Sequence, residues 1–190
     1  MAPDDDVLMQ RIATRDEDAF QLLVLRWQQP VFGFLWHMLR SREEAEDLTQ
    51  DVFLKVLDQA PRYRPEGKFR SWVLRIAANR ARSSLRRRSV LRWVRFDPSL
   101  HDRPRGEDDA STQLERDETA RRVQDAIRRL PQRQQEAVVL RRYQDLSYEE
   151  IAVALDATLP AVESLLQRAA ANLRRDLGGA ELRLQGRMES

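Results

Sequence analysis

Arginines and aromatic residues are interleaved along residues 62–95, and both kinds of side chain suit binding to nucleic acid. Cations that neutralise phosphates release counterions, which gives tight and salt-sensitive binding. Aromatic rings stack on unpaired bases for about 1–3 kcal/mol per base. The bases are Arg62, Arg64, Lys68, Arg70, Arg75, Arg80, Arg82, Arg86, Arg87, Arg88, Arg92 and Arg95, and the aromatics are Tyr63, Phe69, Trp72 and Trp93. Glu66 is the only acid, so the segment predicts a nucleic-acid surface rather than a solvated basic face. Trp72 taken alone is better interpreted as a core residue.

Residues 147–177 have the spacing of a helix-turn-helix. A short helix over 148–155 precedes a turn at Asp156-Ala157, and a second helix follows Thr158. This motif places the N-terminal half of its second helix in a major groove. The residues expected to face outward are Ala161, Glu163, Ser164 and Gln167, with Arg168, Arg174 and Arg175 near phosphates and Val162, Leu166 and Leu173 in the core. Glu can accept from cytosine and Gln can read adenine. An ordinary helical hairpin is the alternative interpretation.

An acidic helix face begins after Ser41. Its carboxylates are Glu43, Glu44, Glu46, Asp47 and Asp51, and its apolar face holds Ala45, Leu48, Val52, Phe53, Val56 and Leu57. Paired carboxylates serve acid–base catalysis or metal binding in some proteins. Here they follow a continuous helix surface without a nearby histidine, so a solvated face or a protein-docking surface is expected.

The sequence gives little support for an enzyme. His37 and His101 belong to no motif, and the chain has no Gly-rich phosphate loop, no GxSxG and no HExxH. The absence of cysteine excludes disulfides, thiol catalysis and zinc fingers. We therefore expect a protein that is not an enzyme and that uses no cofactor and no metal.

The elements that must position these residues are helices in two groups. Six glycines and few β-branched runs disfavour a sheet. Apolar residues recur at helical spacing from Asp18, Pro30 is expected to kink or break that run, and a third helix is expected near Ser71. Capping-box spacings are Ser41 with Glu44, Thr112 with Glu115, and Ser147 with Glu150, while Pro131 and Thr158 mark two further helix starts.

The predicted fold is therefore all-α, with two small helical domains joined by a flexible acidic linker. The first domain spans residues 1–95, the linker 96–111 and the second domain 112–177, and the tail 178–190 is expected to fray. The linker contains Pro98, Pro104 and Gly106 beside the acidic cluster Glu107, Asp108 and Asp109.

The amino-acid composition and the apolar stretches limit the class of protein to which the chain can belong. Charged residues make up 34% and hydrophobic residues 42%, which is polar but compatible with a folded chain. The acidic start of the chain has no apolar core typical of a secretory signal, and the longest apolar stretch, residues 31–39, is too short to span a bilayer. A cytoplasmic protein without membrane insertion is expected.

Two pairs of segments together resemble a known family. AEDLTQDVFLKV and RPEGKFRSWVLRIAANRARSSLRRR resemble the second conserved region of extracytoplasmic-function sigma factors, a branch of the bacterial sigma-70 family. LPQRQQEAVVLRRYQDLSYEEIAVAL and LPAVESLLQRAAANLRR resemble their fourth region. The resemblance covers most of the chain in the right order. It implies a subunit that directs promoter-specific initiation by core RNA polymerase, acts in a stress or envelope- or metal-type response, and is controlled by an anti-sigma factor. No small-molecule substrate is implied.

The resemblance also implies roles for matching positions. Polymerase docking would involve Asp47, Leu48, Gln50, Asp51 and Phe53. Melting of the minus-10 element and capture of a flipped base would involve Tyr63, Arg64, Lys68, Phe69, Trp72, Arg75, Asn79 and Arg80. Reading of the minus-35 duplex would involve Thr158, Ala161, Glu163, Ser164, Gln167 and Arg168. The acidic linker would run toward the RNA exit channel.

The sequence departs from the family pattern in the part that resembles the fourth region. Asp156 stands where members often have Gly, and Glu163 and Leu165 stand where many carry cations, which suggests a distinct promoter preference. Two other functions stay open: a stand-alone helix-turn-helix regulator, and a helical adaptor that binds only proteins. A plain regulator has no need of an acidic docking helix followed by a basic, aromatic segment.

Overall fold

The computed structural model describes residues 3–94 and 114–188, and it describes side-chain surroundings for residues 3–90 and 120–178. The elements are α1 (Asp5–Ala13), α2 (Glu17–Leu39), α3 (Arg42–Gln59), the 3₁₀ turn η1 (Ala60–Arg62), α4 (Phe69–Val94), α5 (Leu114–Arg129), α6 (Gln132–Tyr143), α7 (Tyr148–Leu155) and α8 (Leu159–Met188). All regular structure in these ranges is helical, which confirms the predicted fold class. The expected linker, residues 96–111, and the Thr112–Glu115 cap lie outside the described residues.

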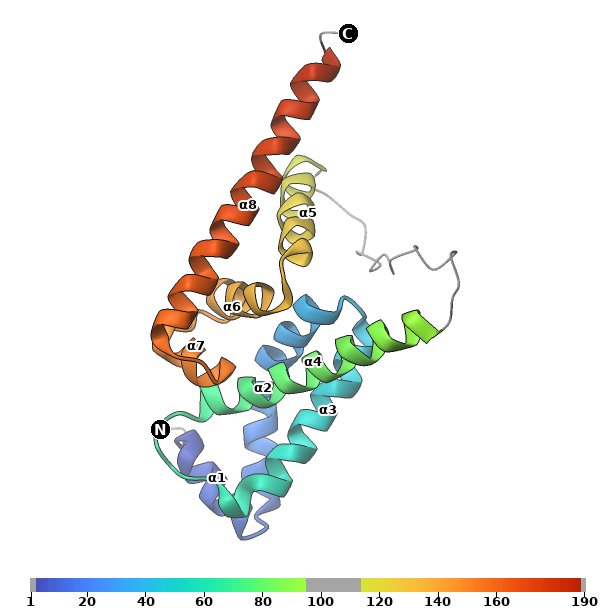
Figure 1. The fold of residues 1–190 in the computed structure, drawn as a ribbon. Helices are drawn as coiled ribbons and strands as arrows, with labels where there is room; N and C mark the ends of the chain where they lie inside the picture. The colour runs from blue at the N-terminus through green and yellow to red at the C-terminus, as the bar shows by residue number, and fades with distance from the viewer. Residues whose placement is uncertain (1–2, 95–113, 189–190) are drawn as a thin grey trace.

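Helices α1 to α4 form the first unit. Helix α2 packs against α1, α3 and α4, and α4 crosses the bundle in Figure 1. The helices pack together because they place large apolar side chains in a shared core, where Leu8, Leu23, Phe34 and Leu74 are fully buried. Burial of one such side chain contributes about 1.5–3 kcal/mol.

Helices α5 to α8 form the second unit. The long helix α8 packs against α5, α6 and α7 and then extends away from the rest of the molecule (Figure 1). Its first half is anchored by Val162, which is fully buried with Leu140 and Ile151. This packing holds the start of α8 against α7, and the two helices are joined by a short turn, which is the arrangement of elements in a helix-turn-helix.

Three of the predicted helix caps are present, one of them only in part. Ser147 and Glu150 form a full capping box: the Ser147 N–H donates to Glu150 at 2.7 Å, and the Glu150 N–H donates to Ser147 at 3.2 Å. The hydroxyl of Thr158 accepts from the Ala161 N–H at 3.4 Å. Ser41 caps α3 through the Glu44 N–H at 3.3 Å, but the Glu44 side chain binds Ser84 and Arg88 on α4 instead of closing the box.

Three boundaries differ from the sequence-based expectation. Pro30 lies inside α2, which is unbroken, because buried residues on both sides, such as Leu23 before it and Val31 after it, hold the helix against the core. Helix α4 begins at Phe69 rather than near Ser71. Helix α8 continues to Met188, past the predicted start of fraying at Gly178, through a stretch rich in helix formers such as Ala, Glu, Leu and Gln.

The two units contact one another, with α7 on α4 and α6 on α2. Their buried apolar residues belong to one continuous cluster. The ring of His37 stacks on Tyr143 with centroids 3.7 Å apart and planes 17° apart. Arg70 donates to the Gln144 carbonyl and lies 3.8 Å from the Glu150 carboxylate. Nothing in the sequence pattern predicted this arrangement.

Candidate nucleic-acid interface

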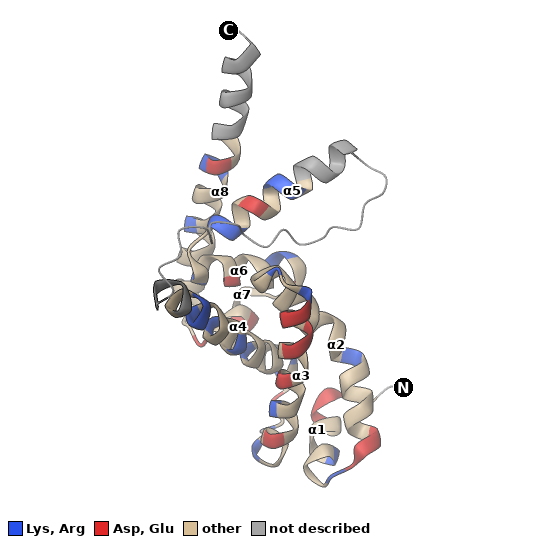
Figure 2. Ribbon diagram, turned by 90° about the vertical axis from the view of Figure 1, so that its right-hand side faces the viewer, with Lys and Arg blue, Asp and Glu red and all other residues tan. Residues whose placement is uncertain are grey.

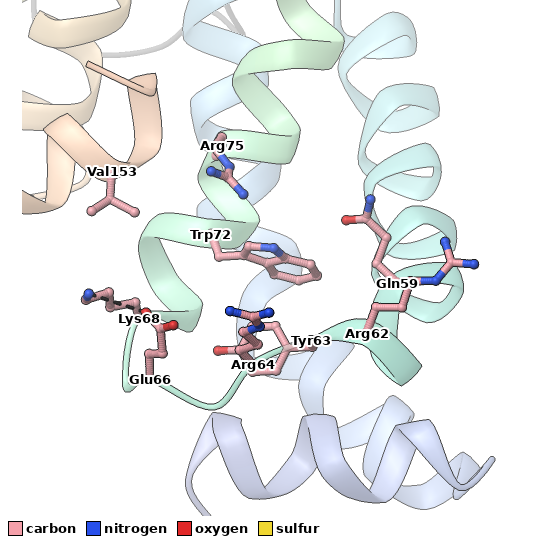
Figure 3. Close-up of a pocket in the computed structure, with 9 residues that line it drawn as sticks. All are labelled: Gln59, Arg62, Tyr63, Arg64, Glu66, Lys68, Trp72, Arg75 and Val153. Atoms are coloured by element: carbon pink, nitrogen blue, oxygen red, sulfur yellow. Dashed lines mark hydrogen bonds and ion pairs between the residues drawn. The ribbon is translucent and has the colours of Figure 1, made fainter. Parts of the chain in front are cut away.

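A hollow of about 400 Å³ opens where α3, η1 and α4 meet. It is lined by Gln59, Arg62, Tyr63, Arg64, Glu66, Lys68, Trp72 and Arg75, with Val153 contributed by α7. Figure 3 shows the indole of Trp72 between Arg75 on one side and Tyr63 and Arg64 on the other. The hollow therefore combines aromatic surface with a rim of cations.

The aromatic surface is the outer layer of a four-ring cluster. Phe69 is at its centre, with ring centroids 5.6 Å from Trp27, 6.0 Å from Tyr63 and 5.6 Å from Trp72. Tyr63 and Trp72 meet edge to face at 4.9 Å. Phe69, which was expected to contact DNA, is only 3% exposed and supports the other rings from the core. Trp72 is partly buried in this cluster and partly open to the hollow.

The cations of the rim are well placed for phosphates. Arg62, Arg64 and Lys68 are exposed, and Arg75 is partly exposed. Lys68 lies 3.5 Å from Glu66, the one acid of this segment, and both side chains are more than half exposed, so this pair leaves Lys68 accessible. An exposed pair of this kind contributes roughly 0–1 kcal/mol and does not compete strongly with a phosphate.

Four lining residues were not in the predicted site: Gln59, Arg62, Glu66 and Val153. Arg62 belongs to the basic segment but precedes the predicted loop, and Gln59 ends the acidic helix. Gln59 reaches the hollow because the chain turns through η1 at Pro61 immediately after it. Sequence spacing gives the turn but not the direction in which the last helical side chain points.

The basic residues further along α4 form two groups: some pair with an acid on another helix, and others are exposed. Arg82 pairs with Glu136 on α6, and Arg88 pairs with Glu44 on α3. Asn79, Arg86 and Arg87 are exposed, and Arg80 is partly exposed. A second hollow of about 640 Å³ follows this side of α4 and is lined by Asn79, Arg82, Ser83, Leu85, Arg86, Ser89 and Gln132. Figure 2 shows the basic residues following α4.

The acidic helix α3 presents some of its predicted docking residues and buries others. Asp47 and Gln50 are exposed, and Asp51 is partly exposed. Leu48 and Phe53 are 8% and 5% exposed, so they hold α3 in the bundle and do not reach a partner directly. Two apolar residues of this helix are exposed, Leu54 at 63% and Leu57 at 43%. Leu54 was not named from the sequence, and Leu57 was expected on the buried face.

The helix-turn-helix is formed by α7, the turn at Asp156-Ala157, and α8. Asp156 adopts the left-handed conformation, with φ 51° and ψ 56°, where glycine is the ordinary residue. Thr158, Glu163, Gln167 and Arg168 are exposed, and Ala161 and Ser164 are partly exposed. All six residues expected to read DNA are thus at least partly accessible, Thr158 just before α8 and the other five within it, while Val162 is buried as predicted.

Within the described residues, no group of three or more His, Cys, Asp or Glu is arranged to hold a metal ion. No helix in the same part of the chain is long and apolar enough to cross a bilayer.

Comparison with known proteins assigns both units. The family described as Sigma-70 region 2 matches residues 23–91, and Sigma-70, region 4 matches residues 120–173. RNA polymerase sigma-H factor of Pseudomonas aeruginosa is 31% identical over 173 residues, covering 87% of this chain and 89% of that protein. RNA polymerase sigma factor CarQ of Myxococcus xanthus is 34% identical over 175 residues, covering 92% and 98%. ECF RNA polymerase sigma-E factor of Haemophilus influenzae is 33% identical over 174 residues, covering 87% and 90%.

Solved structures share the fold. CnrH in complex with the cytosolic domain of CnrY superposes with a TM-score of 0.69 at 24% identity, covering 92% of this chain and 97% of that one. The sigma factor RpoE in complex with the anti-sigma factor NepR from Bartonella quintana superposes with a TM-score of 0.64 at 22% identity, covering 84% and 96%. At these identities the likeness is one of architecture.

Proposed function

The chain belongs to the extracytoplasmic-function branch of the sigma-70 family of RNA polymerase sigma factors, and from this membership we propose how its surfaces share the recognition of a promoter. Sigma factors bind core RNA polymerase and promoter DNA, and the family is non-catalytic. The function of each surface is therefore a matter of binding and of DNA deformation.

The hollow beside Trp72 is assigned to the minus-10 element. A base that leaves the duplex loses a few kcal/mol of stacking and pairing. Trp72 and Tyr63 offer rings on which it can stack, and Arg64, Lys68 and Arg75 stand around them for the flanking phosphates. This combination of a ring platform and a basic rim is the observation that carries the proposal. Asn79 and Arg80 extend the contact along α4.

The exposed face of α3 is assigned to core polymerase. Asp47 and Gln50 are polar and accessible, and the exposed Leu54 lies one helical turn beyond Gln50. Interfaces of this composition bury an apolar centre inside a polar rim. Leu48 and Phe53 would act from beneath, by holding the helix in place.

The start of α8 is assigned to the minus-35 duplex. Its exposed residues combine Glu163 and Gln167, which can read base edges, with Arg168 and Arg174 for the backbone. We assign residues 1–95 to the first functional domain, 96–111 to the acidic linker toward the RNA exit channel, and 112–177 to the second domain.

Control by an anti-sigma factor is part of the proposal. The support is that the RpoE structure with the same fold holds an anti-sigma factor, NepR. The chain would act in the cytoplasm with its polymerase, in a response to stress, to envelope damage or to metals.

Reconstitution tests the proposal. Purified protein is added to bacterial core polymerase, and promoter fragments from genomic DNA are selected by run-off transcription. Specific initiation that depends on the added protein is expected. Bound duplex DNA without any effect on polymerase would favour a stand-alone regulator instead. Absence of salt-dependent DNA binding would favour an adaptor that binds only proteins.

A further inference from the structure

A single carboxylate on the first helix holds both ends of the loop beside the hollow. The Tyr63 hydroxyl donates to Asp6 Oδ1 at 2.6 Å, and the Gly67 backbone N–H donates to Asp6 Oδ2 at 2.7 Å. Asp6 lies in the first turn of α1 and is 57 and 61 residues from these partners. Each oxygen of the carboxylate thus has its own donor.

The two donors bracket the segment that carries the basic rim. Arg64, Pro65 and Glu66 lie between them, and all three are exposed. Gly67 has φ 67°, in the left-handed region, where the chain reverses toward α4. Because exposed loop residues gain little from packing, a carboxylate bound at both ends is a direct means of giving this loop one shape.

The neighbouring carboxylate acts on the same ring cluster from beneath. The indole N–H of Trp27 donates to Asp5 Oδ2 at 3.0 Å, and Trp27 meets the buried Phe69 edge to face. Asp5 also pairs with Arg26. Two consecutive acids of α1 therefore hold the four-ring cluster at two places, at Trp27 in its base and at Tyr63 on its open side.

Tyr63 stays a hydrogen-bond donor under all ordinary conditions. Burial, the hydrogen bond to Asp6 and the nearby acids of α1 raise the pKa of Tyr63 well above its usual value. The phenol therefore does not ionise in the range in which the protein works, and its bond to the Asp6 carboxylate is charge-assisted and correspondingly strong.

We propose that Asp6 is a positioning residue for promoter opening, which fixes the loop 63–68 so that the rings of Tyr63 and Trp72 form a ready platform for an unstacked base. This inference rests on the assignment of the hollow to the minus-10 element. A platform formed in advance removes the ordering cost that a mobile loop would add at the moment of binding. Asp6 does not touch DNA, and its effect passes through Tyr63 and Gly67.

The simpler account is that acids at the start of α1 only stabilise the helix through its dipole. A substitution of Asp4 distinguishes helix stabilisation from positioning of the loop. Asp4 is the N-cap residue of the same helix, it is exposed, and its side chain makes no capping hydrogen bond. Asp4→Asn removes the same charge as Asp6→Asn from nearly the same place but leaves the loop contacts intact.

The experiment uses the full chain bound to core polymerase on a promoter with 2-aminopurine in the minus-10 element. Asp6→Ala, Asp6→Asn and Tyr63→Phe are compared with wild type and with Asp4→Asn. For Asp6→Ala we expect about a tenfold smaller population of unstacked base, since tenfold corresponds to about 1.4 kcal/mol, the order of one hydrogen bond to a charged group. Affinity for core polymerase and for minus-35 duplex should change less than about twofold, and Asp4→Asn should match wild type.

Two further readouts prevent a loss of stability from being mistaken for a positioning effect. Hydrogen exchange at the Gly67 amide, followed by NMR in the free chain, should be faster in Asp6→Ala and unchanged in Asp4→Asn. The double variant Asp6→Ala with Tyr63→Phe should lose less than the sum of the two single losses, because both act through one bond. Tyr63→Phe keeps the ring and tests the bond should Asp6→Ala fold poorly.

The outcomes distinguish a failure of the minus-10 assignment of the hollow from a failure of the positioning role of Asp6. If wild type opens no promoter, the assignment of the hollow fails and this inference falls with it. If wild type opens promoters and the Asp6 variants do so equally well, although Gly67 exchange is faster, the positioning role alone is overturned. An equal loss in Asp4→Asn would likewise overturn it in favour of helix stabilisation.

Discussion

Arg82 on α4 lies 3.1 Å from the carboxylate of Glu136 on α6, and the Glu136 side chain is fully buried. Arg133 lies 3.5 Å from the other carboxylate oxygen. Burial raises the pKa of Glu136, while the charges of Arg82 and Arg133 counteract that rise. The pair joins the two units, and because its atoms lack hydrogen-bond alignment, the attraction is one of charge alone.

Loss of Arg82 should therefore weaken both the fold and the contact between units. Breaking a buried pair ordinarily costs 3–5 kcal/mol, and because Arg133 remains we expect roughly 2–3 kcal/mol for Arg82→Ala. Denaturant unfolding measures the free energy, and small-angle scattering measures the separation of the units. Arg86→Ala, an exposed change one turn further on, should stay within about 0.5 kcal/mol. The double change Arg82→Met with Glu136→Leu should be at least as stable as wild type, and a large loss there would show that the charges themselves are needed.

His37 should make stability depend on pH. Burial, with a smaller effect from Arg40, lowers the pKa of His37 from 6.5 to about 4. The unfolded chain therefore binds a proton at a higher pH than the folded chain, and stability is lost as pH falls from 6.5 to about 4, by at most about 3 kcal/mol. Glu136 acts in the opposite direction: its raised pKa favours the folded chain as pH falls toward 4.5.

Two variants separate these opposing contributions. His37→Phe keeps a ring to stack on Tyr143 and should remove the loss of stability below pH 6.5. Glu136→Gln should make that loss steeper. Free energies of unfolding at pH 7, 6 and 5 measure both slopes. Unchanged slopes in both variants would contradict this assignment.

Asp47 should be needed for binding to core polymerase and dispensable for folding. Asp47 is exposed on α3, so Asp47→Arg is expected to lower polymerase affinity by more than about tenfold while the free energy of unfolding stays within about 0.5 kcal/mol. Affinity is measured by fluorescence anisotropy of labelled protein. Glu46→Arg makes the same charge reversal on an adjacent face of α3 and serves as the control. Equal loss in both variants would indicate a nonspecific charge effect.

Lys68 and Arg80 should matter more for strand opening than for duplex binding. Lys68 lines the hollow beside Trp72, and the partly exposed Arg80 lies further along α4. The double change to Ala is expected to lower the fraction of open promoter about tenfold and duplex affinity less than about threefold. Permanganate reactivity of unpaired thymines reports opening. Arg87→Ala removes an exposed cation farther along α4 and should weaken binding without affecting the opening step.

Glu163 should set preference at one base pair of the minus-35 element. Replacement by Ala should cost about 1–3 kcal/mol of discrimination at that pair and leave the others unchanged. Arg174→Ala offers a contrast, because a phosphate contact should weaken binding to all sequences and lower the salt slope by about one. Affinities across single-base variants of the element distinguish the two patterns. An unaltered preference profile would remove Glu163 from the reading residues.

The sequence predicted those parts of the structure that depend on neighbours along the chain. The Ser147–Glu150 box, the Thr158 cap and the buried Val162 all follow from residues within one or two helical turns. Helical period correctly placed Phe53 on the buried face of its helix, but it also placed Leu57 there, which is 43% exposed near the end of the helix.

Contacts between residues far apart in the sequence could not be predicted from the sequence pattern. The resemblance implied that Phe69 contacts DNA, whereas its buried ring packs edge to face on Trp27, 42 positions earlier in the sequence. No motif in the sequence linked the acids of α1 to a distant segment, whereas Asp6 binds a loop 57 residues away. Such pairings depend on how helices dock, and one sequence carries no periodic signal for that.

Val153 gives the hollow beside Trp72 a wall that belongs to the other unit. The shape of the hollow is therefore a property of both units at once, and its occupancy and their separation are thermodynamically linked. A ligand that fits the hollow as it stands holds α7 against α4. A strand that requires a wider opening drives the units apart, and any partner that has already parted them improves the binding of that strand by the same factor.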